Sequence, residues 1–367
     1  MKRPVTLLTL ILLTIPELSY SQARWEVLWP AKPLESRQDT VTLYLIGDVM
    51  MHTAQIPLDH STFLSDISEP MLKADCAVAN MEFTLAGEPY TGYPCFSAPD
   101  SYAHTLAQQC GIDVFLTANN HITDKGTSGL LRTLDVYDSL RESLGTVFTG
   151  CARDSVEMSA NFPLYIRCKG LKLALVNFTY GTNSGLHGPW PAVFLPDSSR
   201  VLGAVREARR QDSDFVIALP HWGDEYALRH NSFQQTWAEW LVEAGADVIV
   251  GSHPHVVQDT THIKGVPVIY SVGNAVSNMS APNTRLELAV TLRFVCNGPG
   301  KDPAPHMLEP ELEFLWCTLP GRLLRDSHAT IRVKEWAGRR SDWLIPSDYD
   351  NMIATLARVR EATGTGN

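Results

Sequence analysis

The stretch Val41–His52, VTLYLIGDVMMH, shows the pattern that decides the fold. It opens with the near-continuous apolar run VTLYLI, and Asp48 follows directly after that run. Apolar runs of this kind are typical of strands that are covered on both faces of a sheet. The stretch therefore predicts a buried strand that presents a carboxylate at its end.

The same pattern returns along the chain, because short apolar runs alternate with polar clusters and helix-like stretches. The later runs are CAVA (76–79), DVFLTA (113–118), LALVNF (173–178), DFVIAL (214–219), DVIV (247–250) and VPVIYSV (266–272). Alternation of strands with helices indicates an α/β fold.

Three of the intervening stretches have helical spacing of apolar residues. They are SYAHTLAQQC (101–110), TSGLLRTLDVYDSLRESLG (127–145) and SFQQTWAEWLVEAG (232–245). Gly111 is expected to cap the first helix, and Gly245 to end the third. Asn231 or Ser232 is the expected N-cap of the third helix. Its aromatic residues fall on one face, which indicates core packing.

The pattern changes after about residue 283. TRLELAVTLRFVC (284–296) and PELEFLWCTL (310–319) alternate like antiparallel strands, and SDYDNMIATLARVREAT (347–363) predicts a final helix. We therefore expect one α/β domain over residues 41–282, preceded by an entry segment over 22–40. A C-terminal antiparallel β extension with a terminal helix is expected over 283–367.

The first 21 residues predict a signal peptide. Lys2 and Arg3 give a basic start, Val5–Ile15 an apolar stretch, and Ser19–Ser21 a small-x-small cleavage site. The protein is expected to be exported, and to be periplasmic or at the cell surface. An uncleaved N-terminal membrane anchor is the alternative, although the apolar stretch is short for a membrane span.

Composition excludes some classes of partner and leaves the cysteines open. The 367 residues carry a net charge of −10, which disfavours a broad nucleic-acid surface. The seven cysteines are an odd number with wide spacings and no CxxC pair, so their pairing cannot be deduced. Burial is the expected state of a cysteine in an apolar run, such as Cys76.

Polar residues collect where six of the predicted strands end. In open α/β sheets, ligands bind outside the carboxyl ends of the strands, so these residues are expected to meet at one edge. The set comprises Asp48, Asn80, Glu82, Asn119, Asn120, His121, Asp124, His221, Asp224, Glu225, Tyr226, His253, His255 and Asn274.

Six of these residues together form a mixed oxygen and nitrogen ligand set: Asp48, Glu82, Asn120, His221, His253 and His255. Such a set suits one or two divalent transition metals such as Mn, Zn or Fe, rather than a structural zinc. Taken alone, the His253-Pro-His255 segment is equally consistent with a polar turn, although Pro254 would hold the two imidazoles in place. With two ions, one carboxylate would bridge them and an activated water would be the nucleophile.

His121 and Asp124 are the candidates for acid–base chemistry. His121 could protonate a leaving group or support a developing oxyanion, and Asp124 could orient its ring. The alternative for Asp124 is a helix N-cap.

The ordered motifs GDVMMH, NMEF, TANNHITDKG, PHWGDEY, GSHPHVVQ and YSVGN resemble the bacterial capsule-synthesis CapA (PgsA) family. That family is linked to poly-γ-glutamate and is related to the calcineurin-like metallophosphoesterases. The resemblance runs from about residue 43 to residue 278. It implies a layered α-β-β-α sandwich of metallophosphoesterase type with a dinuclear metal site.

The resemblance also implies residue roles. Asp48 matches the first metal-binding Asp, Glu82 the bridging carboxylate, and Asn120 and His121 the Asn-His signature of ligand and catalytic His. The later histidine ligands are matched by His221, His253 and His255. Family-specific positions near the substrate are matched by Glu225, Tyr226, Tyr270, Ser271 and Asn274.

Two positions depart from the pattern that the resemblance implies. Metallophosphoesterases usually begin with Asp-x-His, and Met50 occupies the His position here, with His52 two residues further on. Ala275 stands where the family usually has Phe after Gly-Asn. The first departure bears on one metal position and the second on packing beside the substrate.

Three functions follow as hypotheses. The first is an exported metal-dependent hydrolase or transferase of capsule or poly-γ-glutamate metabolism, with an anionic polymer or phosphoester as substrate and capsule-synthesis membrane proteins as partners. The second is a non-catalytic accessory of polymer synthesis or export that binds metal and polymer. The third is a periplasmic phosphoesterase.

Overall fold

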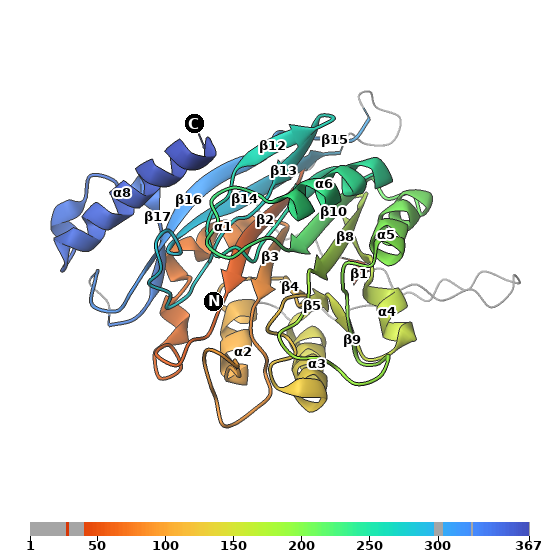
Figure 1. Ribbon diagram of the computed structural model, residues 1–367, viewed down its shortest axis with the longest axis horizontal. Coiled ribbons are helices and arrows are strands. Elements are labelled where there is room, and N and C mark those ends of the chain that lie inside the picture. Colours follow the sequence, from red (N-terminus) through yellow and green to blue (C-terminus); the bar gives the residue numbers. More distant parts are fainter. Residues whose placement is uncertain (1–26, 29–39, 297–303, 324–325, 367) are drawn as a thin grey trace, which may run out of the picture.

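The computed structural model describes residues 27–28, 40–296, 304–323 and 326–366. The predicted signal peptide and most of the entry segment lie outside these residues. Two β-sheets form the middle of the molecule, with helices on the outside (Figure 1). In the described part of the chain, no helix has the length and hydropathy that a membrane span requires.

The first sheet has seven strands, and four of them supply its parallel centre. In spatial order the strands are β1 (Val27–Leu28), β7 (Leu164–Cys168), β8 (Leu171–Thr179), β10 (Phe215–His221), β11 (Val248–Val250), β13 (Val266–Ile269) and β12 (Thr260–Ile263). Strands β8, β10, β11 and β13 are parallel neighbours, so their carboxyl ends lie at one edge.

The second sheet has eight strands and joins the C-terminal part of the chain to the N-terminal part. In spatial order they are β17 (Ala329–Arg332), β16 (Glu311–Thr318), β14 (Leu286–Val295), β2 (Thr40–Val49), β3 (Cys76–Met81), β4 (Val114–Leu116) and β5 (Val147–Thr149), while β15 (His306–Met307) pairs with β14. Strand β14 is antiparallel to β2, so the sheet continues without a break across residue 283. A separate pair is formed by β6 (Cys151–Ala152) and β9 (Ala192–Val193).

Helices lie on the outer faces of the two sheets and at their ends. They are α1 (Ser68–Lys73), α2 (Asp100–Gln108), α3 (Gly126–Leu144), α4 (Ser155–Asn161), α5 (Ser198–Arg210), α6 (Ser232–Ala244), α7 (Val333–Trp336) and α8 (Pro346–Thr363). Short 3-10 turns cover His60–Thr62, Ser65–Ile67 and Arg340–Asp342.

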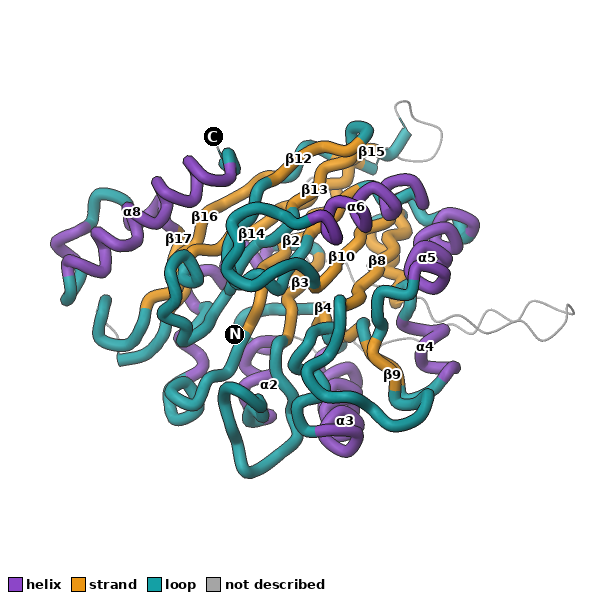
Figure 2. The backbone as a smooth tube through the Cα atoms, viewed as in Figure 1, coloured by secondary structure: helices purple, strands orange, loops and turns teal. Residues whose placement is uncertain are grey.

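Side-chain alternation in β2 explains the layers. Val41 and Leu43 point into the core between the two sheets, whereas Tyr44 and Ile46 point to the opposite face, where α1, α2 and α3 pack. A third core lies between the other sheet and helices α5 and α6. The order of layers is therefore helix, sheet, sheet, helix, which confirms the predicted α-β-β-α sandwich (Figure 2).

The helix signals in the sequence match the structure closely at α6. Asn231 forms a capping box with Gln234, and Gly245 ends the helix with a φ of 114°. The final helix and the two antiparallel strands β14 and β16 are also confirmed. Helix α2 ends at Gln108, two residues earlier than predicted.

Candidate metal centre

Two parallel strands of the second sheet deliver the carboxylates of the site. Asp48 lies near the end of β2 beyond an irregularity in its pairing with β3, and Glu82 follows β3 directly. The Asp48 amide donates to the Gly273 carbonyl at 3.0 Å. A Cβ on Gly47 would lie 2.0 Å from the Gly273 oxygen, so only glycine allows this approach of the two sheets.

The first sheet delivers the imidazoles. His221 is the last residue of β10, and His253 and His255 lie in the turn after β11. Both turn residues have positive φ, 99° at His253 and 58° at His255. Such backbone conformations are uncommon for residues other than glycine and cluster at functional sites. The His253–His255 segment is therefore a tight turn that also positions two imidazoles.

The side chains form two ligand groups that share Glu82. One group comprises Glu82, His221 and His253, and the other comprises Asp48, Glu82 and His255. One Glu82 oxygen lies 3.6 Å from His221 Nε2, and the second lies 3.8 Å from His255 Nδ1. Asn120 joins the first group, because its Oδ1 lies 2.8 Å from His221 Nε2. Glu82 thus stands between two positions, as a bridging carboxylate does.

Burial and neighbouring charge perturb these groups in opposite directions. Burial, reinforced by the nearby Asp48 carboxylate, raises the pKa of Glu82 well above its usual value. Burial and the adjacent imidazoles lower the pKa of His221 and of His253, so both are neutral at pH 7. Burial also opposes charge on His255, but Glu82 and Asp48 outweigh it and raise the pKa of His255 to about 9.

The unmet bonding capacity of the cluster fits a divalent cation. Within the part of the chain that the structure describes, both Glu82 carboxylate oxygens and His253 Nδ1 are buried without a hydrogen-bond partner. Leaving such groups unpaired is costly, and a cation would satisfy all three. Neutral imidazoles are also the form in which histidine binds metal. The ring of His221 is oriented from its other nitrogen, Nδ1, which lies 2.9 Å from Ser252 Oγ.

The Asp48 side of the cluster is the poorer in ligands. Met50 is buried in the apolar core beneath α1, α2 and α3, so it offers nothing to a metal there. Among the described residues, His52 belongs to none of the ligand groups, and its Nδ1 lies 3.1 Å from the Gln55 side-chain oxygen and 3.2 Å from the Asn278 backbone nitrogen. A third group of ligand atoms joins the exposed Glu225 to His253 and His255. Glu225, predicted as a substrate-side residue, is therefore also a candidate ligand.

His121 and Asp124 form a buried pair beside the cluster. His121 Nδ1 lies 2.8 Å from an Asp124 carboxylate oxygen, and that oxygen also accepts a hydrogen bond from the Phe96 amide. The Phe96 ring meets the His121 ring edge-on, with ring centroids 4.6 Å apart. Asp124 lies two residues before α3, and its carboxylate contacts His121 and Phe96 rather than capping that helix.

The residues predicted to lie near the substrate divide into two sets. Tyr226 is exposed near His255, with ring centroids 6.2 Å apart, and Asn274 contacts His255 Nδ1 through its Oδ1 at 2.9 Å. Asn274 thus positions a candidate ligand. Tyr270 is held to α6 by a hydrogen bond to Gln235, and the Ser271 hydroxyl donates to the Val256 carbonyl. The structure does not bring these two side chains into the cluster, and their contact with substrate stays a prediction.

Two residues near the cluster, on the loop after β8, were not predicted from the sequence. The side-chain amide nitrogen of Asn183 lies 3.2 Å from His121 Nδ1, and the ring centroid of Tyr180 lies 4.4 Å from the ring centroid of His253. Both follow the predicted strand LALVNF, so the rule that placed the other residues at strand ends would have found them. Asn80, which was noted at a strand end without a role, donates to Asp48 Oδ1 at 2.7 Å.

A layered sandwich with a buried cluster of carboxylates and imidazoles, where strand ends of both sheets meet, defines a candidate metal-binding protein. The sequence profile of the family described as "Bacterial capsule synthesis protein PGA_cap" matches residues 42–279, more than half of the chain. The chain belongs to this family, which confirms the resemblance seen in its motifs.

Two relatives named for capsule or PGA biosynthesis align with most of the chain. "Capsule biosynthesis protein CapA" of Bacillus anthracis is 27% identical over 297 residues, which are 75% of this chain and 68% of that protein. "PGA biosynthesis protein CapA" of Bacillus subtilis (strain 168) is 26% identical over 277 residues, which are 72% of this chain and 70% of that protein.

Solved structures resemble the chain more distantly. A 5'-nucleotidase precursor from Thermus thermophilus has a TM-score of 0.45 and 16% identity, and the match covers 76% of this chain but only 54% of that one. The calcineurin-like phosphoesterase YfkN from Bacillus subtilis has a TM-score of 0.42 and 12% identity, covering 75% of this chain and 90% of that one.

Proposed function

We propose that the chain is an exported protein of capsule or poly-γ-glutamate metabolism that acts as a metal-dependent hydrolase or transferase. Its family membership and the capsule and PGA biosynthesis names of its relatives support the process. The observation that carries the chemistry is the buried His121–Asp124 pair beside the shared ligand Glu82. The proposed substrate is an anionic polymer or a phosphoester, and capsule-synthesis membrane proteins are the proposed partners.

The proposed ligands would hold one or two divalent ions of Mn, Zn or Fe. When bound, such ions would supply Lewis-acid chemistry where the two sheets meet. The residues that would hold them are Asp48, Glu82, Asn120, His221, His253 and His255.

His121 supplies the proton for the leaving group. Its Nδ1 faces the Asp124 carboxylate, so Nε2 is the nitrogen from which a proton passes to the departing oxygen or nitrogen. Asp124 stabilises the charged imidazolium and fixes the ring, while the Phe96 ring packs against it with the two ring planes perpendicular. Asp124 is in turn held in place by the Phe96 amide.

Met50 favours a second candidate function, a non-catalytic accessory of polymer synthesis or export. Met50 stands where an Asp-x-His motif would have its histidine, and its side chain is buried among apolar residues. The metal position at Asp48 therefore lacks that ligand. A weakly held or single ion could organise the binding of a carboxylate polymer without turning it over.

Metal analysis combined with a substrate panel separates these functions. The mature chain is assayed with phosphodiester, phosphomonoester and γ-glutamyl substrates, beside His121→Ala and the control His262→Ala, which changes an exposed histidine paired with Glu309. We expect His121→Ala to lower turnover by about 10²- to 10⁴-fold with unchanged metal content. The control should match the wild type.

The other possible outcomes distinguish between the remaining functions. Stoichiometric metal and polymer binding without turnover supports the accessory function. Turnover of phosphoesters alone supports a periplasmic phosphoesterase. A folded protein that binds no divalent ion contradicts the assignment of the site.

A further inference from the structure

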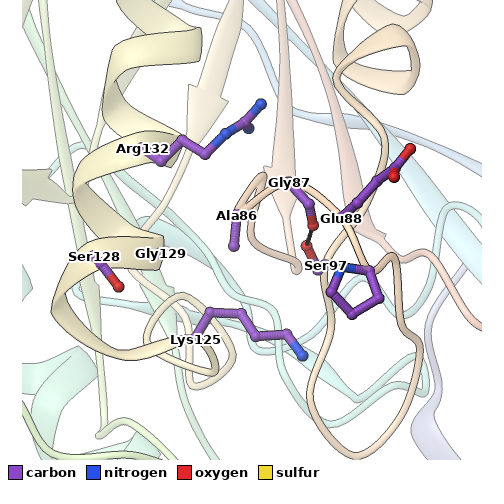
Figure 3. A pocket seen from close by; sticks show the side chains of 9 residues that line it. Ala86, Gly87, Glu88, Ser97, Lys125, Ser128, Gly129 and Arg132 are labelled. Atoms are coloured by element: carbon purple, nitrogen blue, oxygen red, sulfur yellow. Dashed lines mark hydrogen bonds between the residues drawn. The ribbon is translucent and has the colours of Figure 1, made fainter.

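A cavity of about 310 Å³ lies next to the His121–Asp124 pair and is not used by the proposed chemistry. It is bounded by the segment after Glu82, by Ser97 and by the first turns of α3 (Figure 3). Its lining residues are Ala86, Gly87, Glu88, Pro89, Ser97, Lys125, Ser128, Gly129 and Arg132. Its size is at the lower end of ligand pockets, which suits one small polar unit.

Lys125 is the unpaired cation of this cavity. It forms no ion pair with any residue in the described ranges, and in Figure 3 it reaches across the cavity toward the loop that carries Ser97. Arg132 differs, because its guanidinium is neutralised by two hydrogen bonds of 2.8 Å to Asp100. The Glu88 carboxylate points away from Lys125 in the same view. The free positive charge in the cavity is therefore that of Lys125.

Two glycines shape the cavity around the basic side chains. A Cβ on Gly129 would lie 2.3 Å from Lys125 Cβ and 3.2 Å from Ala86 Cβ, so glycine is needed for Lys125 to pass there. Gly87 has a φ of 85°, and a Cβ on it would lie 3.2 Å from Arg132 Nε. The two glycines therefore leave room for the Lys125 and Arg132 side chains beside the cavity.

Three segments connect the cavity to the candidate metal centre. Lys125 follows Asp124, Ser97 follows Phe96, and Ala86 comes four residues after the shared ligand Glu82. Four residues span at most about 14 Å. One extended substrate chain can therefore place its reacting bond at the centre and a neighbouring charged group at Lys125.

We propose that this cavity is a subsite for a carboxylate of a γ-linked glutamate chain, with Lys125 as the charged contact. This inference rests on the proposed function, since it names the substrate class of that site. The positive end of the α3 dipole adds to the charge of Lys125. A polymer with a carboxylate on each unit would gain affinity from such a contact one or a few units away from the reacting bond.

Calorimetric titration of the full mature chain with a short γ-linked glutamate oligomer tests the subsite. We expect Lys125→Met to weaken binding about tenfold, the size of one charge-assisted contact. The matched control is Lys73→Met, which removes the same charge from α1, where Lys73 pairs with Glu69. Gly129→Ala keeps the charge but displaces Lys125, and it should weaken binding as well.

The titration is repeated after removal of metal and with inorganic phosphate. Oligomer binding that depends on Lys125 and survives metal removal supports the subsite, whether or not the protein turns over any substrate. Turnover without oligomer binding overturns the subsite and leaves the proposed hydrolase in place. Equal oligomer affinity of the wild type and Lys125→Met, or an equal loss of oligomer affinity in Lys73→Met, also overturns the subsite. The same holds if phosphate binds more tightly than the oligomer and this phosphate binding is lost in Lys125→Met.

Discussion

At the scale of single residues, Glu82 is the point where binding and stability oppose each other. Its carboxylate is buried, lacks a hydrogen-bond partner among the described residues and is repelled by Asp48. We expect Glu82→Gln to make the metal-free protein more stable by about 1–3 kcal/mol, because the cost of burying this acid and its repulsion by Asp48 outweigh its attraction to His255. The same change should abolish stoichiometric metal binding, since Glu82 belongs to both ligand groups that include Asp48 or His221.

Thermal unfolding with and without added metal, together with metal analysis, measures both effects. Glu243→Gln is the matched control, because Glu243 is exposed and pairs with Lys264 on the surface. The control should change neither stability nor metal content. Wild-type metal content in Glu82→Gln would show that this carboxylate is not a shared ligand.

At the scale of elements, a buried ion pair connects helix α8 to the second sheet. Arg285, just before β14, makes two hydrogen bonds of 2.6 and 2.7 Å to Asp348 in the first turn of α8. Asp348→Ala would leave Arg285 buried and unpaired, and should lower the free energy of unfolding by about 3–5 kcal/mol. The double change Arg285→Met with Asp348→Leu should restore most of this loss.

Urea unfolding of the wild type and these variants, with Asp350→Ala as control, tests this account. Asp350 lies on the same helix and pairs with Arg340 on the exposed surface, so its removal should leave the midpoint nearly unchanged. If Asp348→Ala and Asp350→Ala behave alike, the ion pair is not what holds α8.

Elements with strong local signals could be predicted from the sequence, and those that depend on partners could not. The capping box at Asn231 and the glycine stop at Gly245 fixed α6, because both act within one turn. The run DVFLTA predicts six strand residues, but β4 has only Val114–Leu116. The chain leaves the ladder there because the Ala118 amide donates instead to Asn177 Oδ1 on β8. That contact joins the two sheets and has no local signature.

At the scale of the whole molecule, the two facing sheets decide how far the site could be predicted. The strand-end rule placed Asp48, Glu82 and His221 correctly beside one another, because all three lie at carboxyl ends. It could not show that Met50 faces the core and that Gln55 engages His52, since both depend on packing against α2 and residue 278. The division into two ligand groups likewise required the sheets to be docked.

Docking of the C-terminal strands over the N-terminal loop also makes global stability depend on pH. His328 is fully buried, with its Nε2 3.1 Å from Asn278 Oδ1 and its ring against Phe63. Burial, with the nearby His52 and Arg285, lowers the pKa of His328 to about 4. The unfolded chain binds a proton at this residue below about pH 6.5, whereas the folded chain does not until about pH 4. Stability from this residue is therefore complete above pH 6.5 and is lost as the pH falls toward 4, by up to about 3 kcal/mol.

Urea unfolding at several pH values between about 7.5 and about 4.5 measures this loss against His328→Gln, which keeps an amide donor for Asn278 but does not titrate. Because His52, whose pKa is also lowered to about 4, is present in both proteins, its contribution cancels in the comparison. The wild type should lose more stability than the variant over this range, so the difference between them should shrink as the pH falls. Parallel curves would mean that the cost of charging His328 is relieved by rearrangement, and that the contact between residues 52–63 and the C-terminal strands is looser than the buried ring indicates.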